Sequence, residues 1–159
     1  MSDDMGMLRV DVEIENHTRP GDRRLLHHVI VDTGAELSWA PAAVLEDLGI
    51  ARVKQIRFQQ ADGSVLERWV GFAILHAAGA VTSDEIVFGA PEDLVLLGAR
   101  TLEGMNLKVD LVERRLVAGG PMLAAMAGHA PHPLLVYRPG VTSQRRPPGP
   151  AAGDTRRER

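Results

Sequence analysis

Residues 25–31 are mostly apolar and end directly on Asp32-Thr33-Gly34-Ala35. Such a run predicts a buried strand that carries the carboxyl group of Asp32 into a turn, where Gly34 permits a tight bend. This pattern has two interpretations. A strand that fixes an aspartate, beside a glycine that admits a second backbone, is what a pair of catalytic carboxylates needs. Aspartate also favours turns for structural reasons alone, and three residues do not decide between the two.

The first 117 residues repeat this pattern of short strands and tight turns. Residues 8–14 alternate apolar and charged side chains, as a half-buried strand does, and Pro20-Gly21-Asp22 predicts the turn of a hairpin. Short helices are expected where Pro41 begins a turn that Gly49 ends, over 41–48, and at 100–105. Further strands are predicted at 53–59, 65–75, 81–88 and 94–97, and two more within 107–117. The predicted fold is therefore mostly β.

Composition excludes several classes of protein. The 159 residues are 45% hydrophobic with a net charge of −3, which suits one globular domain and gives no electrostatic case for binding nucleic acid or a membrane. The absence of cysteine removes disulfides, thiolate catalysis and cysteine-based metal sites. The six histidines show no metal-ligand spacing. Because we recognise neither a signal peptide nor a membrane span, we expect a cytoplasmic protein.

Changes in composition set the expected boundaries. Residues 1–6 are predicted to be a flexible N-terminus and residues 7–118 to be the folded domain. Residues 119–137 are apolar but rich in glycine, proline and alanine. Three roles stay open for them: an interface segment, a segment that folds back over a cleft, or a loosely attached one. Residues 138–159 are rich in proline and arginine and are predicted to be disordered.

Three landmarks together resemble the retroviral-like aspartic proteases, that is, the retropepsins and their bacterial relatives, over roughly residues 8–117. The first landmark is the loop at Asp32. The second is a turn at 61–64 between two predicted strands, at the distance where the family has a flap that closes over substrate. The third is Val95-Leu96-Leu97-Gly98, which is similar to the second signature of the family. The resemblance implies a retropepsin-like fold, a closed orthogonal β-barrel with one lobe per chain.

The resemblance also implies a mechanism. Pepsin-like enzymes carry two Asp-Thr/Ser-Gly loops in one chain, whereas this chain has one. A working site therefore needs Asp32 from each subunit of a homodimer. The two carboxylates share a proton and activate a water that hydrolyses a bond of a peptide or protein substrate. This chemistry requires no metal and no cofactor.

Neighbouring residues acquire roles by the same resemblance. Thr33, Gly34 and Ala35 would support the active-site loop. Glu36 and Arg100 resemble a structural ion pair of the family, the alternative being two unrelated surface charges. Trp39 is either a packing aromatic or part of a substrate subsite. The residues expected in the flap and against substrate are Ala61, Asp62, Gly63 and Ser64.

A function of another class stays open. The chain could be a dimerisation or peptide-binding module of the retropepsin fold with little or no proteolytic activity. The intact Asp-Thr-Gly argues against that alternative, because a protein without activity need not keep an aspartate at a buried dimer axis.

Overall fold

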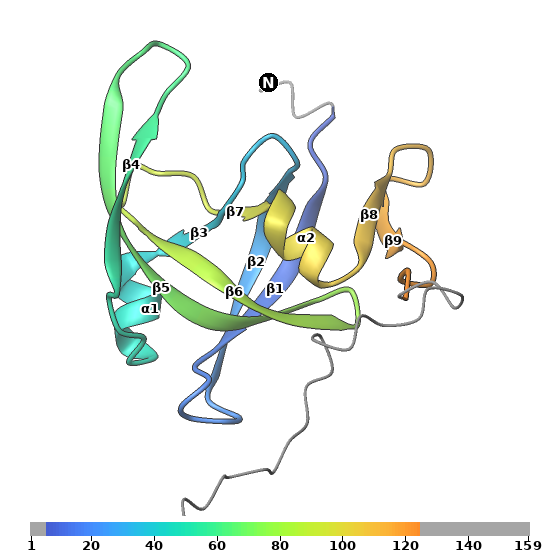
Figure 1. Ribbon diagram of the computed structural model, residues 1–159, viewed down its shortest axis with the longest axis horizontal. Helices are drawn as coiled ribbons and strands as arrows, with labels where there is room; N and C mark the ends of the chain where they lie inside the picture. Colours follow the sequence, from blue (N-terminus) through green and yellow to red (C-terminus); the bar gives the residue numbers. More distant parts are fainter. Residues whose placement is uncertain (1–5, 125–159) are drawn as a thin grey trace, which may run out of the picture. The chain divides into compact units, whose positions relative to one another are not determined.

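The computed structural model describes residues 6–124 of the chain, and this part is mostly β (Figure 1). Two short helices interrupt the strands, α1 (Ala42–Asp47) and α2 (Ala99–Gly104). The strands are β1 (Arg9–Glu15), β2 (Arg23–Asp32), β3 (Ser38–Pro41), β4 (Lys54–Gln59), β5 (Val65–Ala77), β6 (Ala80–Gly89), β7 (Leu96–Gly98), β8 (Leu107–Asp110) and β9 (Arg115–Ala118).

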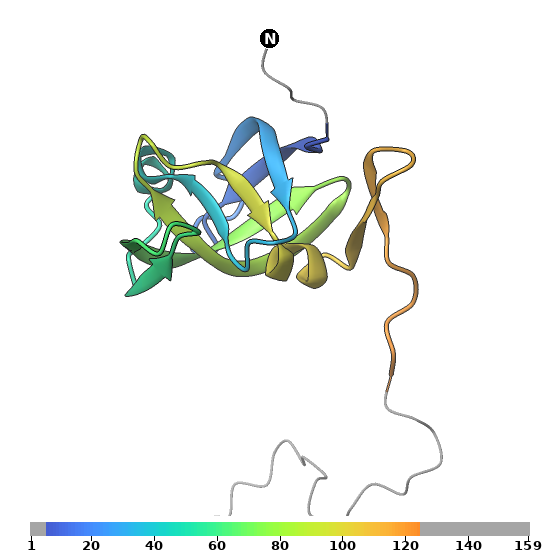
Figure 2. The same cartoon turned by 90° about the horizontal axis from the view of Figure 1, so that it is seen from above.

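Six of the strands close into a barrel. They pair in the order β1-β2-β7-β3-β6-β5, and a further pairing of β1 with β5 joins the two ends. β4 pairs with β5 outside this ring, so the β4–β5 hairpin extends beyond the barrel at the upper left of Figure 1. β8 and β9 form a separate hairpin beside the barrel, as Figure 2 shows. The predicted fold class, mostly β with a closed barrel and short helices, is confirmed.

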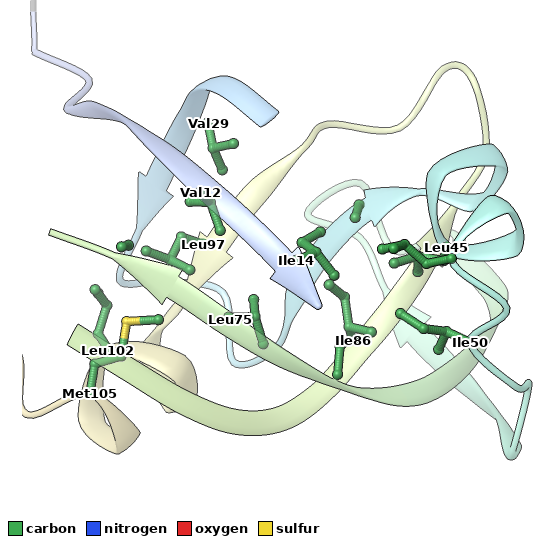
Figure 3. Packing of buried hydrophobic residues seen from close by; sticks show 14 of the residues in the cluster. Val12, Ile14, Val29, Leu45, Ile50, Leu75, Ile86, Leu97, Leu102 and Met105 are labelled. Carbon is green, nitrogen blue, oxygen red and sulfur yellow. The ribbon is translucent and has the colours of Figure 1, made fainter. Parts of the chain in front are cut away.

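Side-chain alternation sorts the apolar residues onto two faces of the sheet. The larger cluster fills the barrel and is mainly aliphatic (Figure 3), with Leu45, Leu97 and Ile86 almost completely buried. The smaller cluster consists of buried Leu37, Val70 and Val87, with Trp39, Ile56 and Phe58 packed on it. Val87 lies between Ile86 and Phe88, which belong to the larger cluster, so the two clusters occupy opposite faces of β6.

Most predicted elements appear within a few residues of their expected bounds, but β3 was not predicted. Its four residues, Ser-Trp-Ala-Pro, are too few to show a period of two. Their strand conformation comes from pairing with β6 on one side and β7 on the other. β3 thereby connects the loop after β2 to the two strands that flank it.

Several sequence predictions concern residues outside the described part. These are residues 1–5, the predicted disordered tail at 138–159, and all of the predicted apolar extension beyond residue 124. Within residues 6–124, no helix is long and apolar enough to span a membrane.

Asn16 joins the β1–β2 connection to the end of α1. Its side chain is buried, donates to the carbonyl oxygen of Leu48 at 2.8 Å, and accepts from the backbone N–H and the hydroxyl group of Thr18 at 2.9 and 2.8 Å. Both ends of the side-chain amide are therefore satisfied inside the protein. The amide thus fixes the bottom of the first hairpin against the helix.

We expect Asn16→Ala to lower the free energy of unfolding by about 1–3 kcal/mol, because the buried carbonyl group of Leu48 loses its donor. Urea denaturation monitored by circular dichroism measures this change. His17→Ala is the control, since His17 is exposed and its removal should change the stability by less than about 0.5 kcal/mol. Equal stability of the two variants would contradict the role given to Asn16.

Candidate active site

Asp32 is the last residue of β2, and its carboxyl group shapes the turn that follows. Its Oδ1 accepts a hydrogen bond from the backbone N–H of Gly34 at 2.9 Å, and its carbonyl oxygen accepts one from the N–H of Ala35 at 3.2 Å. Asp32 and Ala35 are partly buried, whereas Thr33 and Gly34 are exposed. The loop thus holds the aspartate in one orientation at a surface that a substrate or another subunit can reach.

The second sequence landmark lies directly beside this loop. β2 and β7 run parallel, with Asp32 opposite Gly98. The backbone N–H groups of Ala99 and Arg100 donate to the carbonyl oxygens of Ala35 and Glu36 at 2.8 and 3.1 Å. A Cβ atom on Gly98 would lie 2.6 Å from the carbonyl group of Leu37. Position 98 therefore has room for glycine alone, because the loop crosses over it.

A buried chain of hydrogen bonds supports Gly98 at the point where the loop passes over it. The backbone N–H of Gly98 donates to Ser38 Oγ at 2.9 Å, and Ser38 Oγ lies 2.6 Å from Thr101 Oγ1. Thr101 donates to Asp84 Oδ2 at 3.0 Å, and this bond uses its single hydroxyl hydrogen. Ser38 must then donate to Thr101. All hydrogen bonds of the chain point from Gly98 towards the carboxylate of Asp84.

Sequence reasoning missed Ser38, Thr101 and Asp84. Ser38 and Thr101 are the most deeply buried polar residues of this region, at 1% and 0% exposure. Their contact joins the residue that opens β3 to the third residue of α2. A single sequence gives no signal of such a contact. The sequence indicates a role near the site only through position, since Ser38 follows Asp32 closely and Thr101 follows Gly98 closely.

The backbone N–H of Arg100 donates to the carbonyl oxygen of Glu36, but the guanidinium group of Arg100 has other partners. It contacts Asp84 Oδ1 and Glu85 Oε2, each at 3.3 Å. Arg100 is the second residue of α2, and α2 packs on β6, so the side chain extends over the acidic residues of that strand. Lys54, and after it Arg100, lower the pKa of Glu85. The predicted pairing of Arg100 with the Glu36 carboxylate is thus replaced by a cluster on β6.

The predicted flap is the β4–β5 hairpin, and its tip is held by its own side chains. Gly63 has a φ of +84° and donates to the carbonyl oxygen of Gln60 at 2.9 Å. Asp62 Oδ1 accepts from the backbone N–H and the hydroxyl group of Ser64, at 2.8 and 2.6 Å. These bonds, the hydroxyl one first, lower the pKa of Asp62. Ala61 and the other tip residues are exposed. The tip is therefore held in its turn by hydrogen bonds among its own residues.

The base of this flap is anchored to the loop that leads into β7. Arg68 of β5 makes two hydrogen bonds to Asp93, from Nε at 2.6 Å and from a terminal nitrogen at 3.0 Å. Asp93 also accepts from the backbone N–H of Ala90 at 2.7 Å. Arg68, and after it Ala90, lower the pKa of the Asp93 carboxyl group, which is 9% exposed. Sequence reasoning did not find this pair.

Strand register shows which residues share a face with Asp32. Residues directly opposite on paired strands point to the same side, as do residues two apart on one strand. Asp32 lies opposite Gly98, and Leu96, two residues before Gly98 on β7, lies opposite Trp39. Trp39 in turn lies opposite Val87, which lies opposite Val70. We call this surface the Asp32 face. It carries the smaller apolar cluster, on the opposite side of the sheet from the barrel interior.

No group of three or more histidine, aspartate or glutamate side chains suited to a metal ion is present within residues 6–124. The chemistry available around Asp32 is that of a carboxyl group, backbone N–H groups and an apolar face. Asp84, the acid of the network described above, is bound by Thr101 and Arg100.

Comparisons with known proteins find similarity among solved structures. No family model matches the chain, and no curated protein matches it. The solution structure of the simian foamy virus (mac) protease is similar over 60% of this chain and 91% of that one, with 21% sequence identity and a TM-score of 0.41.

We expect Ser38→Ala to destabilise the protein by about 1–3 kcal/mol, because the buried N–H of Gly98 loses its acceptor. Thr101→Val should have an effect of similar size. Combined, the two substitutions should cost less than the sum, since both remove the same chain of bonds. Urea denaturation of the single and double variants measures the coupling. Ser83→Ala, at an exposed position of β6, is the matched control. If the costs of Ser38→Ala and Thr101→Val added exactly, the two hydroxyl groups would not belong to one chain of hydrogen bonds.

The Arg68–Asp93 pair should make stability depend on pH. Because the pKa of Asp93 is lowered in the folded protein, its contribution is complete above the ordinary carboxyl value and is lost as the pH falls through the lower, folded one. At pH 6, Asp93→Asn should cost about 1–3 kcal/mol, and the difference from the wild type should shrink below about pH 4.

Urea denaturation between pH 3 and pH 7 tests this expectation. Glu92→Gln is the matched control, because Glu92 is exposed and lies 3.9 Å from the same arginine. A penalty for Asp93→Asn that stays constant down to pH 3 would show that the ion pair is not its source.

Proposed function

We propose that this protein is an aspartic endopeptidase that works as a homodimer. The observation that carries the proposal is the placement of Asp32, held by Gly34 in an exposed turn and in register with Gly98. Sequence analysis singled out the segments around Asp32 and Gly98 separately, and they are 66 positions apart in the chain. Their pairing side by side supports the proposal of a single site. The flap hairpin and its anchored base supply the third part of a protease half-site.

The chemistry requires a second copy of the chain. With one Asp-Thr-Gly in the sequence, the other carboxylate comes from the Asp32 of a second subunit across a two-fold axis. Two carboxylates at such short range share one proton. The ionised member takes a proton from water, which attacks the peptide carbonyl carbon, and the protonated member donates to the carbonyl oxygen. Thr33 and Gly34, exposed on the loop, would face the partner and the substrate backbone.

The flap would close over a substrate bound in an extended conformation. Backbone groups of Asp62 and Gly63 suit that role, because the Asp62 carboxylate is already engaged by Ser64. An extended peptide recognised through backbone hydrogen bonds gives affinity that varies little with sequence. Closure also excludes water from the two carboxylates, which strengthens electrostatic interactions at the reacting bond.

Asp32→Asn should abolish peptide hydrolysis and leave the thermal midpoint of unfolding within a few degrees of the wild type, since the Asn side-chain oxygen still accepts from Gly34. Cleavage of a peptide library at weakly acidic pH, with circular dichroism for folding, measures both. Asp47→Asn is the matched control, because Asp47 is exposed on α1. Retained hydrolysis by the Asp32 variant would exclude the proposed mechanism.

Dilution provides a separate test of the second copy. Specific activity should fall as the protein is diluted, in step with a shift from dimer to monomer in size-exclusion chromatography, because a monomer holds half of the site. A stable dimer that neither cleaves the library nor binds an inhibitor of the pepstatin kind would support a peptide-binding or dimerisation module. Activity that is independent of concentration, in a monomeric protein, would exclude the homodimeric site.

A further inference from the structure

Trp39 and Phe58 are in ring contact, and they come from elements with different roles. Trp39 belongs to β3, which follows the Asp32 loop, and Phe58 belongs to β4, the outer strand of the flap. The ring centroids are 4.9 Å apart with the planes inclined at 57°, a tilted arrangement that aromatic pairs favour. Both rings are partly buried and pack on Leu37, Val70 and Val87. The contact therefore joins the flap to the sheet beneath it.

The two rings lie on the same side of the sheet as Asp32. Trp39 lies opposite Leu96, two residues before Gly98, and Gly98 lies opposite Asp32. Phe58 packs on the cluster that covers this Asp32 face. A peptide that lies across Asp32 and under the flap would lie on the face that carries this pair. The rings are consequently placed to contact a side chain of the peptide, as well as to pack the flap.

The surroundings of the pair are apolar or already neutralised. Ile30 and Leu96 share the Asp32 face by register, and Ile56 packs beside Phe58. Two cationic residues belong to the same side of the hairpin, but Arg68 is bound by Asp93 and Lys54 by Glu85. A charged side chain placed here would lose water without gaining a free partner. This surface therefore favours an apolar side chain of the substrate over a charged one.

We propose that the Trp39–Phe58 contact is a size filter for the substrate side chain that lies between the flap and β3. This inference rests on the proposed protease function for the position of the substrate. Two rings in contact already occupy the space that a large side chain would need. The filter therefore admits a small apolar residue, such as alanine or valine, and excludes phenylalanine and tyrosine. It makes Trp39 and Phe58 specificity-determining residues.

A peptide series tests the filter, with alanine, valine, leucine or phenylalanine at each of the four positions that flank the cleaved bond. At one of these positions the wild type should prefer the small residues. Trp39→Val and Phe58→Val should each raise the ratio of kcat/KM for phenylalanine over alanine at least tenfold at that position, because truncation opens the space. Two separate variants guard against one of them failing to fold.

Trp69→Val is the matched control. Trp69 is on the flap strand β5, between Arg68 and Val70, so it points to the opposite face and is 39% exposed. The same change from tryptophan to valine should leave the selectivity as it is in the wild type. Unchanged selectivity in both Trp39→Val and Phe58→Val, or an equal change in Trp69→Val, would overturn the filter.

A binding measurement separates failure of the filter from failure of the proposed function. Trp69→Phe leaves Trp39 as the one tryptophan of the chain, so its emission reports directly on the contact. If no variant cleaves, the same peptides are titrated against Trp69→Phe and Trp69→Phe/Phe58→Val. An emission change with alanine or valine peptides, extended to phenylalanine peptides by Phe58→Val, supports the filter without proteolysis. No emission change with any peptide overturns it.

Discussion

The parallel pairing of β2 with β7 is the interaction on which the candidate site depends. It brings Asp32 beside Gly98, and the loop between β2 and β3 can cross above because Gly98 has no side chain. Backbone hydrogen bonds then tie Ala35 and Glu36 to the start of α2. A larger residue at position 98 would push the loop away and move the aspartate with it. The orientation of one carboxyl group is thus a property of two distant segments.

The sheet around this pairing has two apolar faces with different roles. One fills the barrel with aliphatic side chains, which suits a chain in which aromatic residues make up 4%. The other, the Asp32 face, holds Leu37, Val70 and Val87, and two of the few aromatic residues cover them. Alternation along each strand produces this division with no extra element. The barrel core and the Asp32 face are built from the same strands.

Much of this architecture could be predicted from sequence because the signals are local. Alternation identified β1, turn residues placed the tip of the β4–β5 hairpin, and an apolar run ending in glycine identified β7. Contacts between segments far apart in the chain could not be predicted. The partners of Arg100 depend on how α2 packs on β6, and the bond of Ser38 to Thr101 depends on the crossing loop. β3 was missed for the same reason, since its pairing with two neighbours makes it a strand.

The position of β4 outside the closed ring has a consequence for motion. Every barrel strand has at least two hydrogen-bonded neighbours, whereas β4 has β5 alone among the described strands. The hairpin can therefore bend at its base without breaking a ladder of the barrel. Amide hydrogens of β4 should accordingly exchange with solvent through a local opening, at a lower free energy than those of β6. Closure of the ring thus separates a rigid frame from a hinged arm within one continuous sheet.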